Sequence, residues 1–146
     1  MAKDKVEIAI VESNKKIMDG YKRLLETEND LTIIAELSNA TSFLNHNIKH
    51  NPDIIVFDAS QAELNGSNVI MQLSSLMPNV KILVTSVHLD SRFVIRMLHA
   101  GASGYMLKDR AEEDFISALK TVISNHTFIS PGIAGITYEG SEYLKG

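Results

Sequence analysis

The sequence predicts an α/β fold in which a doubly wound parallel sheet of five strands carries helices on both faces. Two observations support this. Short apolar runs alternate with longer stretches in which apolar residues recur at helical spacing, and five such strand–helix units follow one another. The runs are apolar at nearly every position, which is typical of strands buried on both faces, so helices must cover both sides of the sheet. Right-handed crossovers then favour a doubly wound topology.

The first half of the chain contains three predicted strands and two predicted helices. The strands cover residues 6–11, 31–37 and 53–58. The first helix covers 15–28 and the second lies between 40 and 51, and each shows apolar residues at helical spacing. The apolar positions are Ile17, Tyr21, Leu24 and Leu25 in the first helix and Ala40, Phe43, Leu44 and Ile48 in the second. Pro52 ends the second helix, because proline disfavours the helical region for the preceding residue.

The second half contains two predicted strands, 80–85 and 104–107, and three predicted helices. The first helix follows Gly66 and ends before Pro78, the second covers 91–100, and the third follows Asp109 as its N-cap. Gly101 suits the C-terminal cap of the second helix. Residues 131–146 hold four of the eight glycines and show no sustained period. We therefore expect one domain over residues 1–130 and a tail or the start of a linker over 131–146.

Composition excludes several classes of protein. The 146 residues suit a single domain, and the absence of cysteine excludes disulfides, thiolate zinc sites and a cysteine nucleophile. A net charge of −4 gives no general attraction to nucleic acid or to anionic lipid. No apolar run approaches the roughly 20 residues that a membrane helix needs. We expect a cytoplasmic protein without a membrane partner.

Polar side chains follow four of the predicted strands at the point where each strand ends. These residues are Glu12, Ser13, Asp58, Thr85, Ser86 and Lys108. Ligands of open parallel sheets bind beyond the carboxyl ends of the strands. Carboxylates there can hold a divalent cation, Asp58 can attack phosphorus, and Lys108 with a hydroxyl can bind phosphoryl oxygens. The pattern predicts a site for a phosphoryl group and a metal.

Each of these residues also has a structural interpretation when it is taken alone. Asp58 could begin a turn, Ser13 could cap a helix, and Lys108 could be a solvated surface lysine. The hydroxyls of Thr85 and Ser86 could bond to the backbone at the strand end. The joint pattern favours the functional interpretation, while the five histidines show no spacing typical of a metal site.

The sequence resembles the receiver domain of two-component response regulators over about residues 5–130. The motifs that carry the resemblance are Ile-Val-Glu-Ser-Asn (10–14), residues 53–58, 64–66 and 80–86, and Ala-Gly-Ala-Ser-Gly-Tyr-Met-Leu-Lys-Asp (100–109). Asp109 after Lys108, with Ser130 and Pro131 further on, is most similar to the LuxR/NarL-like subfamily, which carries a C-terminal helix-turn-helix.

The resemblance implies a flavodoxin-like sheet of strand order 2-1-3-4-5 and a role for each site residue. Asp58 would accept a phosphoryl group from a sensor histidine kinase, and Lys108 would pair with the phosphoryl oxygens. The spacing selects Ser86 over Thr85 as the hydroxyl that moves, with Tyr105 as the aromatic that turns inward. The resemblance implies that the chain is not an enzyme and that it controls an output, which the subfamily implies is transcription.

The resemblance also suggests partners. Phe93, Tyr105 and Phe115 are expected near the moving hydroxyl, on a face that would serve partner contact or a homodimer. DNA would be bound only through an output domain that is absent from this chain. The magnesium ligands would be Glu12, Asp58 and the backbone carbonyl of Ser60.

Two departures from the family affect the metal side of the site. Ser13 stands where the family usually has a second acid, and Gln61-Ala62 stand where it usually has Met-Pro. We therefore expect weak magnesium binding. The alternative function is a pseudo-receiver, a protein-interaction module that does not depend on phosphorylation. A flavodoxin-like cofactor protein would need a glycine-rich phosphate loop after the first strand, and an aspartyl phosphatase commonly has an acid where Ser60 stands.

Overall fold

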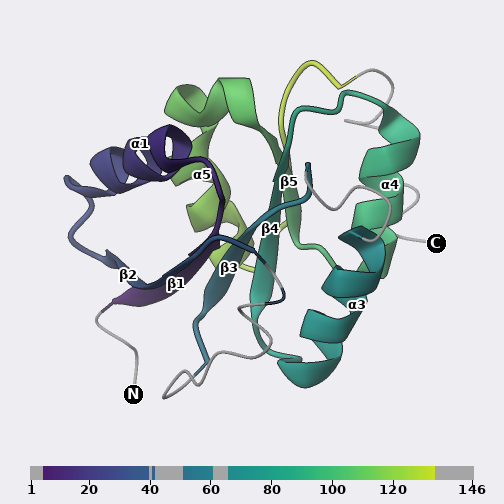
Figure 1. Cartoon of the computed structure of the whole chain (residues 1–146), viewed down its shortest axis with the longest axis horizontal. Coiled ribbons are helices and arrows are strands. Elements are labelled where there is room, and N and C mark those ends of the chain that lie inside the picture. The colour runs from purple at the N-terminus through teal and green to yellow at the C-terminus, as the bar shows by residue number, and fades with distance from the viewer. Residues whose placement is uncertain (1–4, 40, 42–50, 61–65, 134–146) are drawn as a thin grey trace.

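The computed structural model describes residues 5–39, 41, 51–60 and 66–133, and in them one parallel sheet lies between two layers of helices (Figure 1). The strands are β1 (Val6–Val11), β2 (Leu31–Leu37), β3 (Ile54–Asp58), β4 (Lys81–Ser86), β5 (Gly104–Leu107) and β6 (Phe128–Ile129). Their order across the sheet is β2-β1-β3-β4-β5-β6, and every neighbouring pair is parallel.

Helices cover both faces of this sheet. The α-helices of the described residues are α1 (Lys15–Leu25), α3 (Gly66–Leu76), α4 (Ser91–Ala100) and α5 (Ala111–Ile123), and a 3₁₀ turn, η1 (Lys108–Arg110), precedes α5. Figure 1 shows α1 and α5 on one face and α3 and α4 on the other. The helix predicted between residues 40 and 51 lies outside the described residues. None of the helices in the described ranges is long and apolar enough to cross a membrane.

The doubly wound α/β fold and the strand order 2-1-3-4-5 are confirmed, but the expected number of strands is wrong. A sixth strand, β6, pairs with Gly104 and Tyr105 of β5 and extends the sheet by one position. With two residues, β6 is too short to show the alternation by which a strand is detected in a sequence. The backbone N–H of Ser130 continues the pairing, since it donates to the carbonyl of Tyr105 at 3.0 Å.

Alternation along the strands divides the core into two clusters. On β1, Ile8 and Ile10 pack under α1 and α5, whereas Ala9 and Val11 belong to the cluster under α3 and α4. Successive side chains of a strand point to opposite faces. Glu12 therefore follows Ile10 on the α1/α5 face. By the same alternation Asp58 follows Ile54 and Val56 on that face.

The helix ends differ in part from the predictions. Asn14, and not Ser13, is the N-cap of α1, because its side chain accepts a hydrogen bond from Ile17 N at 3.1 Å. Asp109 does not cap α5, since it lies inside η1 and Arg110 occupies the cap position without a side-chain bond. Gly101 does end α4, with φ of +126°, and a Cβ there would also clash with Ser74 Oγ.

The packed part of the chain continues past the predicted domain boundary at residue 130. Ser130 is fully buried, and Ile133 lies in the cluster under α3 and α4 with 3% of its surface exposed. Pro131 and Gly132, which separate them, are exposed.

Candidate functional site

Three charged side chains from three strand ends meet at the carboxyl edge of the sheet. Lys108 Nζ lies 2.9 Å from Glu12 Oε1 and 2.9 Å from Asp58 Oδ1. The carboxylate side chains are 1% and 4% exposed, and that of Lys108 is 11% exposed. Glu12 directly follows β1, Asp58 ends β3, and Lys108 directly follows β5. We refer to Glu12, Asp58 and Lys108 as the strand-end cluster.

Local backbone donors hold both carboxylates in place. Asp58 Oδ1 accepts a hydrogen bond from Ser60 N at 2.9 Å, and Glu12 Oε2 accepts one from Asn14 N at 3.0 Å. Both are side-chain-to-backbone bonds two residues along the chain, which fold the loop back onto the strand end. The contacts of Asp58 found among the described residues all reach Oδ1.

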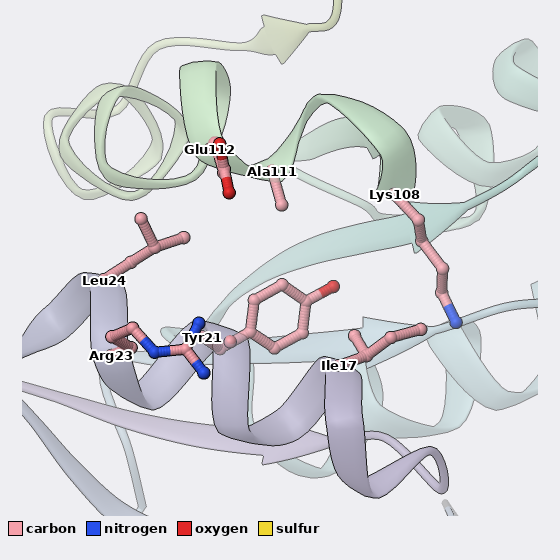
Figure 2. Close-up of a pocket in the computed structure, with 8 residues that line it drawn as sticks. Ile17, Tyr21, Arg23, Leu24, Lys108, Ala111 and Glu112 are labelled. Atoms are coloured by element: carbon pink, nitrogen blue, oxygen red, sulfur yellow. The ribbon is translucent and has the colours of Figure 1, made fainter.

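Tyr21 of α1 brings a hydroxyl to the same site. Its ring is 1% exposed and stacks on Phe115 of α5, with centroids 4.5 Å apart and an interplanar angle of 24°. Tyr21 and Lys108 both line a cavity of about 180 Å³ between α1 and the start of α5, and Figure 2 shows the phenol directed toward the side of the cavity where Lys108 lies. The sequence placed Tyr21 on the buried helix face but did not assign it to the site.

Burial and neighbouring polar groups shift the pKa of Tyr21. Burial raises the pKa of Tyr21, the hydroxyl of Thr85 lowers it, and the negative charges of Glu12 and Asp58 raise it further. A tyrosine among the aliphatic residues of a helix face is the signal that could have identified it, because a buried phenol needs a polar neighbour.

Ser86 and Tyr105 lie on the opposite face of the sheet, under α4. Ser86 Oγ accepts from His88 N at 3.1 Å, and Tyr105 Oη donates to the carbonyl of His88 at 2.9 Å. Burial raises the pKa of Tyr105 to about 12, an effect that Ser86 reduces and the charge of Asp90 increases. Tyr105 is fully buried, so it already points inward in this structure.

Phe93 and Tyr105 lie on the same face of the sheet as Ser86, as expected, but Phe115 does not. Phe93 packs edge-on against Tyr105 with centroids 6.1 Å apart. The expectation for Phe115 is wrong, because its stack on Tyr21 places it on the α1/α5 face. The helical period gives the face of α5 that is buried, but it does not give the side of the sheet that α5 covers.

The donors available for a metal are oxygen atoms of low total charge. Glu12 and Asp58 supply two carboxylates and Ser60 a backbone carbonyl, which are ligands that Mg²⁺ prefers. The side chain of Ser13 is exposed at the start of α1, while Gln61 and Ala62 lie outside the described residues. Within the described part of the chain, no group of three or more histidine, cysteine or acidic residues is arranged to hold a metal. The donor set fits Mg²⁺ in kind, with one carboxylate fewer than the family usually offers.

Comparison with curated proteins finds regulatory proteins, several of them named as transcriptional. Transcriptional regulatory protein DegU from Brevibacillus brevis is 32% identical over 130 residues, which cover 89% of this chain and 55% of DegU. Oxygen regulatory protein NreC from Staphylococcus carnosus is 26% identical and covers 86% of this chain and 58% of NreC. The chain thus spans about half the length of the curated relatives it matches.

Comparison with solved structures and with family models finds response regulators as well. A two-component response regulator of the LuxR family from Aurantimonas sp. SI85-9A1 superposes with a TM-score of 0.82 at 25% identity, covering 94% of this chain and 99% of that one. The isolated REC domain of RcsB from Salmonella enterica serovar Typhimurium, 18% identical, superposes at 0.80 over 97% and 100% of the two chains and supports the fold alone. Residues 8–120 match the family model described as the response regulator receiver domain. The chain therefore belongs to the response regulator receiver domain family.

Proposed function

We propose that this chain is a phosphoacceptor receiver domain that takes a phosphoryl group on Asp58 from a sensor histidine kinase. The observation that carries the proposal is the strand-end cluster, in which a single ammonium lies 2.9 Å from each of two buried carboxylates. A buried carboxylate at the end of a strand, already paired with a cation, is suited to gain further negative charge. The family to which the chain belongs supports the same function.

The transfer needs one nucleophile and one cation from the chain. Asp58 Oδ2 attacks the phosphorus of a phosphohistidine, the new O–P bond forms as the P–N bond breaks, and the imidazole leaves with the electron pair and is protonated. Lys108 stays within reach of the transferred group, because its ammonium already contacts Asp58 Oδ1. As a point charge on a flexible stem, it can follow the phosphoryl oxygens.

Glu12, Asp58 and the backbone carbonyl of Ser60 are the residues that would hold Mg²⁺ in this site. When bound, the ion would neutralise charge on the transferred phosphoryl group. Ser13 can offer at most a neutral hydroxyl where the family usually has a carboxylate. The proposed function therefore includes weaker magnesium binding than three carboxylates would give.

The response to phosphorylation would use the opposite face of the sheet, where Ser86 and Tyr105 lie. Ser86 and Tyr105 are already connected through the backbone of His88, so a shift of the Ser86 hydroxyl toward Asp58 would disturb the Tyr105 contact. DegU is named as a transcriptional regulatory protein, and one structural neighbour is described as RcsB dimers bound to DNA. We propose that this face controls transcription through a DNA-binding output domain, with homodimer formation as part of the response.

The second candidate is a pseudo-receiver that signals through partner binding without phosphorylation. Ser13 favours it, because loss of a metal-binding acid weakens the chemistry while leaving the fold intact. Lys108, Glu12 and Asp58 argue for the phosphorylated receiver, since a pure interaction module has no need of a buried ion cluster at a strand end.

Mass spectrometry of the intact protein separates the two candidates. The protein is incubated with acetyl phosphate and MgCl₂, and phosphorylation of Asp58 would add about 80 Da. An acyl phosphate is lost in mild base, whereas a phosphoserine is not. A base-labile gain supports the receiver, and no gain at any magnesium concentration supports the pseudo-receiver.

A further inference from the structure

The segment that follows α5 runs along the outer edge of the sheet and is anchored on both faces. Phe128 packs against the cluster under α1 and α5, whereas Ile129 packs against the cluster under α3 and α4. Ser130 returns to the α5 face, and Ile133 is buried under α3 and α4. We refer to residues 128–133 as the edge segment, which Figure 1 shows as the yellow end of the described chain beside β5.

Tyr105 connects the edge segment to the residues that are expected to respond to phosphorylation. Its hydroxyl donates to the carbonyl of His88, and the backbone N–H of His88 donates to Ser86 Oγ. The backbone carbonyl of Tyr105 accepts from Ser130 N at 3.0 Å, and Tyr105 pairs with Ile129 in the sheet. One residue therefore holds the loop after β4 through its side chain and the edge segment through its backbone.

The hydroxyl of Ser130 ties the edge segment to two further places. It donates to Asp114 Oδ2 at 2.8 Å and accepts from Leu107 N at 3.0 Å. Leu107 directly precedes Lys108, so the edge segment is also bonded next to the ammonium that would follow the phosphoryl group. Because these bonds have ordinary lengths, a displacement of β5 at Tyr105 or Leu107 must either carry Ser130 with it or break a bond.

Beyond Ser130 the attachment depends on a glycine turn. Pro131 and Gly132 are exposed, and Gly132 has φ of +98°, a conformation that lets the chain turn back and bury Ile133. With only two residues, β6 offers few hydrogen bonds of its own. Segments with few contacts at the edge of a structure open locally at low free energy. The edge segment is thus held by a small number of contacts, several of which depend on Tyr105.

We propose that the edge segment acts as a latch, docked along β5 in the resting domain and released when phosphorylation of Asp58 disturbs the contact between Tyr105 and His88. The inference rests on the proposed function and adds to it the route by which the modified site would act on the chain beyond residue 133. Ile129 and Ile133 pack in the same cluster as the Tyr105 ring, so a new ring position changes the packing of both.

The coupling between the two sites must be reciprocal. If a ligand at Asp58 favours release of the edge segment, then a change that weakens the docking of this segment must favour binding of that ligand by the same factor. A segment that only stabilises the domain is docked equally in both states, and its loss shifts no binding equilibrium. Reciprocity therefore separates a latch from a purely structural segment.

Hydrogen exchange of the full chain tests the release. Beryllofluoride with MgCl₂ replaces the phosphoryl group by a mimic that binds reversibly, and fluorine NMR reports its binding. Mass spectrometry compares the exchange of residues 128–133 with that of residues 8–11 in the sheet core. We expect exchange of the edge segment to become about tenfold faster with the mimic bound, and that of residues 8–11 to stay unchanged. Unchanged exchange of the edge segment would overturn the inference.

Gly132→Ala weakens the docking without removing a contact. A Cβ at this position meets no atom within 4 Å, but the positive φ is costly for alanine, so the edge segment should exchange faster at rest. Reciprocity then predicts that beryllofluoride binds about fivefold more tightly at constant MgCl₂. Faster exchange without a gain in affinity would show a structural role alone and would contradict the latch.

Two further variants act as controls. Gly20→Ala makes the same change inside α1, where the added Cβ also meets no atom within 4 Å, and it should alter neither quantity. An equal gain in affinity there would show that the gain in Gly132→Ala does not come from the edge segment. Tyr105→Phe removes the bond to His88 and keeps the carbonyl that accepts from Ser130. Its edge segment should already exchange faster at rest and respond little to beryllofluoride, whereas a full response would exclude the route through Tyr105.

The outcomes separate this inference from the proposed function. If the wild type gains no acyl phosphate and binds no beryllofluoride, the proposed function fails and the latch fails with it. If the wild type is phosphorylated while its edge segment exchanges as before, only the latch is overturned. Release on phosphorylation together with tighter binding in Gly132→Ala supports both.

Discussion

Two buried carboxylate clusters lie on either side of the end of β5, and they differ in how fully their oxygens are bonded. In the strand-end cluster, Asp58 and Glu12 share the ammonium of Lys108 and each accept one backbone N–H. In the second cluster, Asp114 accepts two hydrogen bonds from the Arg110 guanidinium, at 2.8 and 3.1 Å, and one from Ser130 Oγ at 2.8 Å. We refer to Arg110, Asp114 and Ser130 as the α5 cluster.

This difference in hydrogen bonding indicates that the two clusters have different roles. Ser130 Oγ also accepts from Leu107 N at 3.0 Å, so the α5 cluster ties the residue before Lys108 to the chain that follows β6. A carboxylate whose partners are complete holds structure, because any new ligand would have to displace a bond already made. Near the strand-end cluster, three buried hydroxyls have no regular hydrogen bond within the part of the chain that the structure describes, which suits a site whose charge is to change. We therefore propose that the same residue type serves stability in the α5 cluster and chemistry in the strand-end cluster.

Asp58→Asn gives the largest expected effect and tests the chemical role of the strand-end cluster. An amide cannot form an acyl phosphate, so the base-labile mass gain should be abolished, while the far-UV circular dichroism should be unchanged. Labelling of the variant at the wild-type rate would show that the phosphoacceptor lies elsewhere.

Ser13→Asp enlarges the strand-end cluster by one carboxylate. We expect magnesium to bind more tightly by about 1–3 kcal/mol, or roughly 5–150-fold, because Mg²⁺ favours charged oxygen ligands. Phosphorylation should become faster in parallel, and both quantities can be read from rates measured over a magnesium titration. If the wild type already binds magnesium with ordinary affinity, or if neither quantity changes, another oxygen completes the site.

Lys108→Ala removes the cation of the strand-end cluster and should separate phosphorylation from its response. Asp58 would still be modified, but at a rate lower by about tenfold as one charge contact is lost. The change in amide exchange of α4 and β5 on phosphorylation should be lost more completely than the mass gain. Unfolding of the variant would instead assign Lys108 a structural role, and a normal response would contradict its role in the site.

Asp114→Asn makes in the α5 cluster the same chemical change as Asp58→Asn, and it should have the opposite consequence. The loss of charge weakens the bidentate contact with Arg110, so we expect the free energy of unfolding in urea to fall by about 1–3 kcal/mol. The phosphorylated fraction at saturating acetyl phosphate should remain as in the wild type. A variant that keeps its stability but loses phosphorylation would reverse the assignment of the two clusters.

The sequence determined the fold class, because the alternation of buried strands with amphipathic helices leaves few topologies open. It also placed Glu12, Asp58 and Lys108 at one edge of the sheet, since the carboxyl ends of parallel strands coincide. The resemblance assigned their roles, and those roles stay predictions until the variants are measured. These inferences use only the position of a residue within its own element and the direction of that element.

Only the tertiary structure decided what stands opposite each side chain. Tyr21 is one apolar-face position among several in the sequence, and it joins the site because α1 packs beside α5 over the edge where Glu12 follows β1. Asp114 and Ser130 are 16 positions apart and meet because β6 returns the chain alongside β5. Periodicity gives the face on which a residue lies, but contacts between elements depend on how those faces are packed together. That is why the strand-end cluster could be predicted from the sequence, whereas the hydroxyl of Tyr21 and the α5 cluster could not.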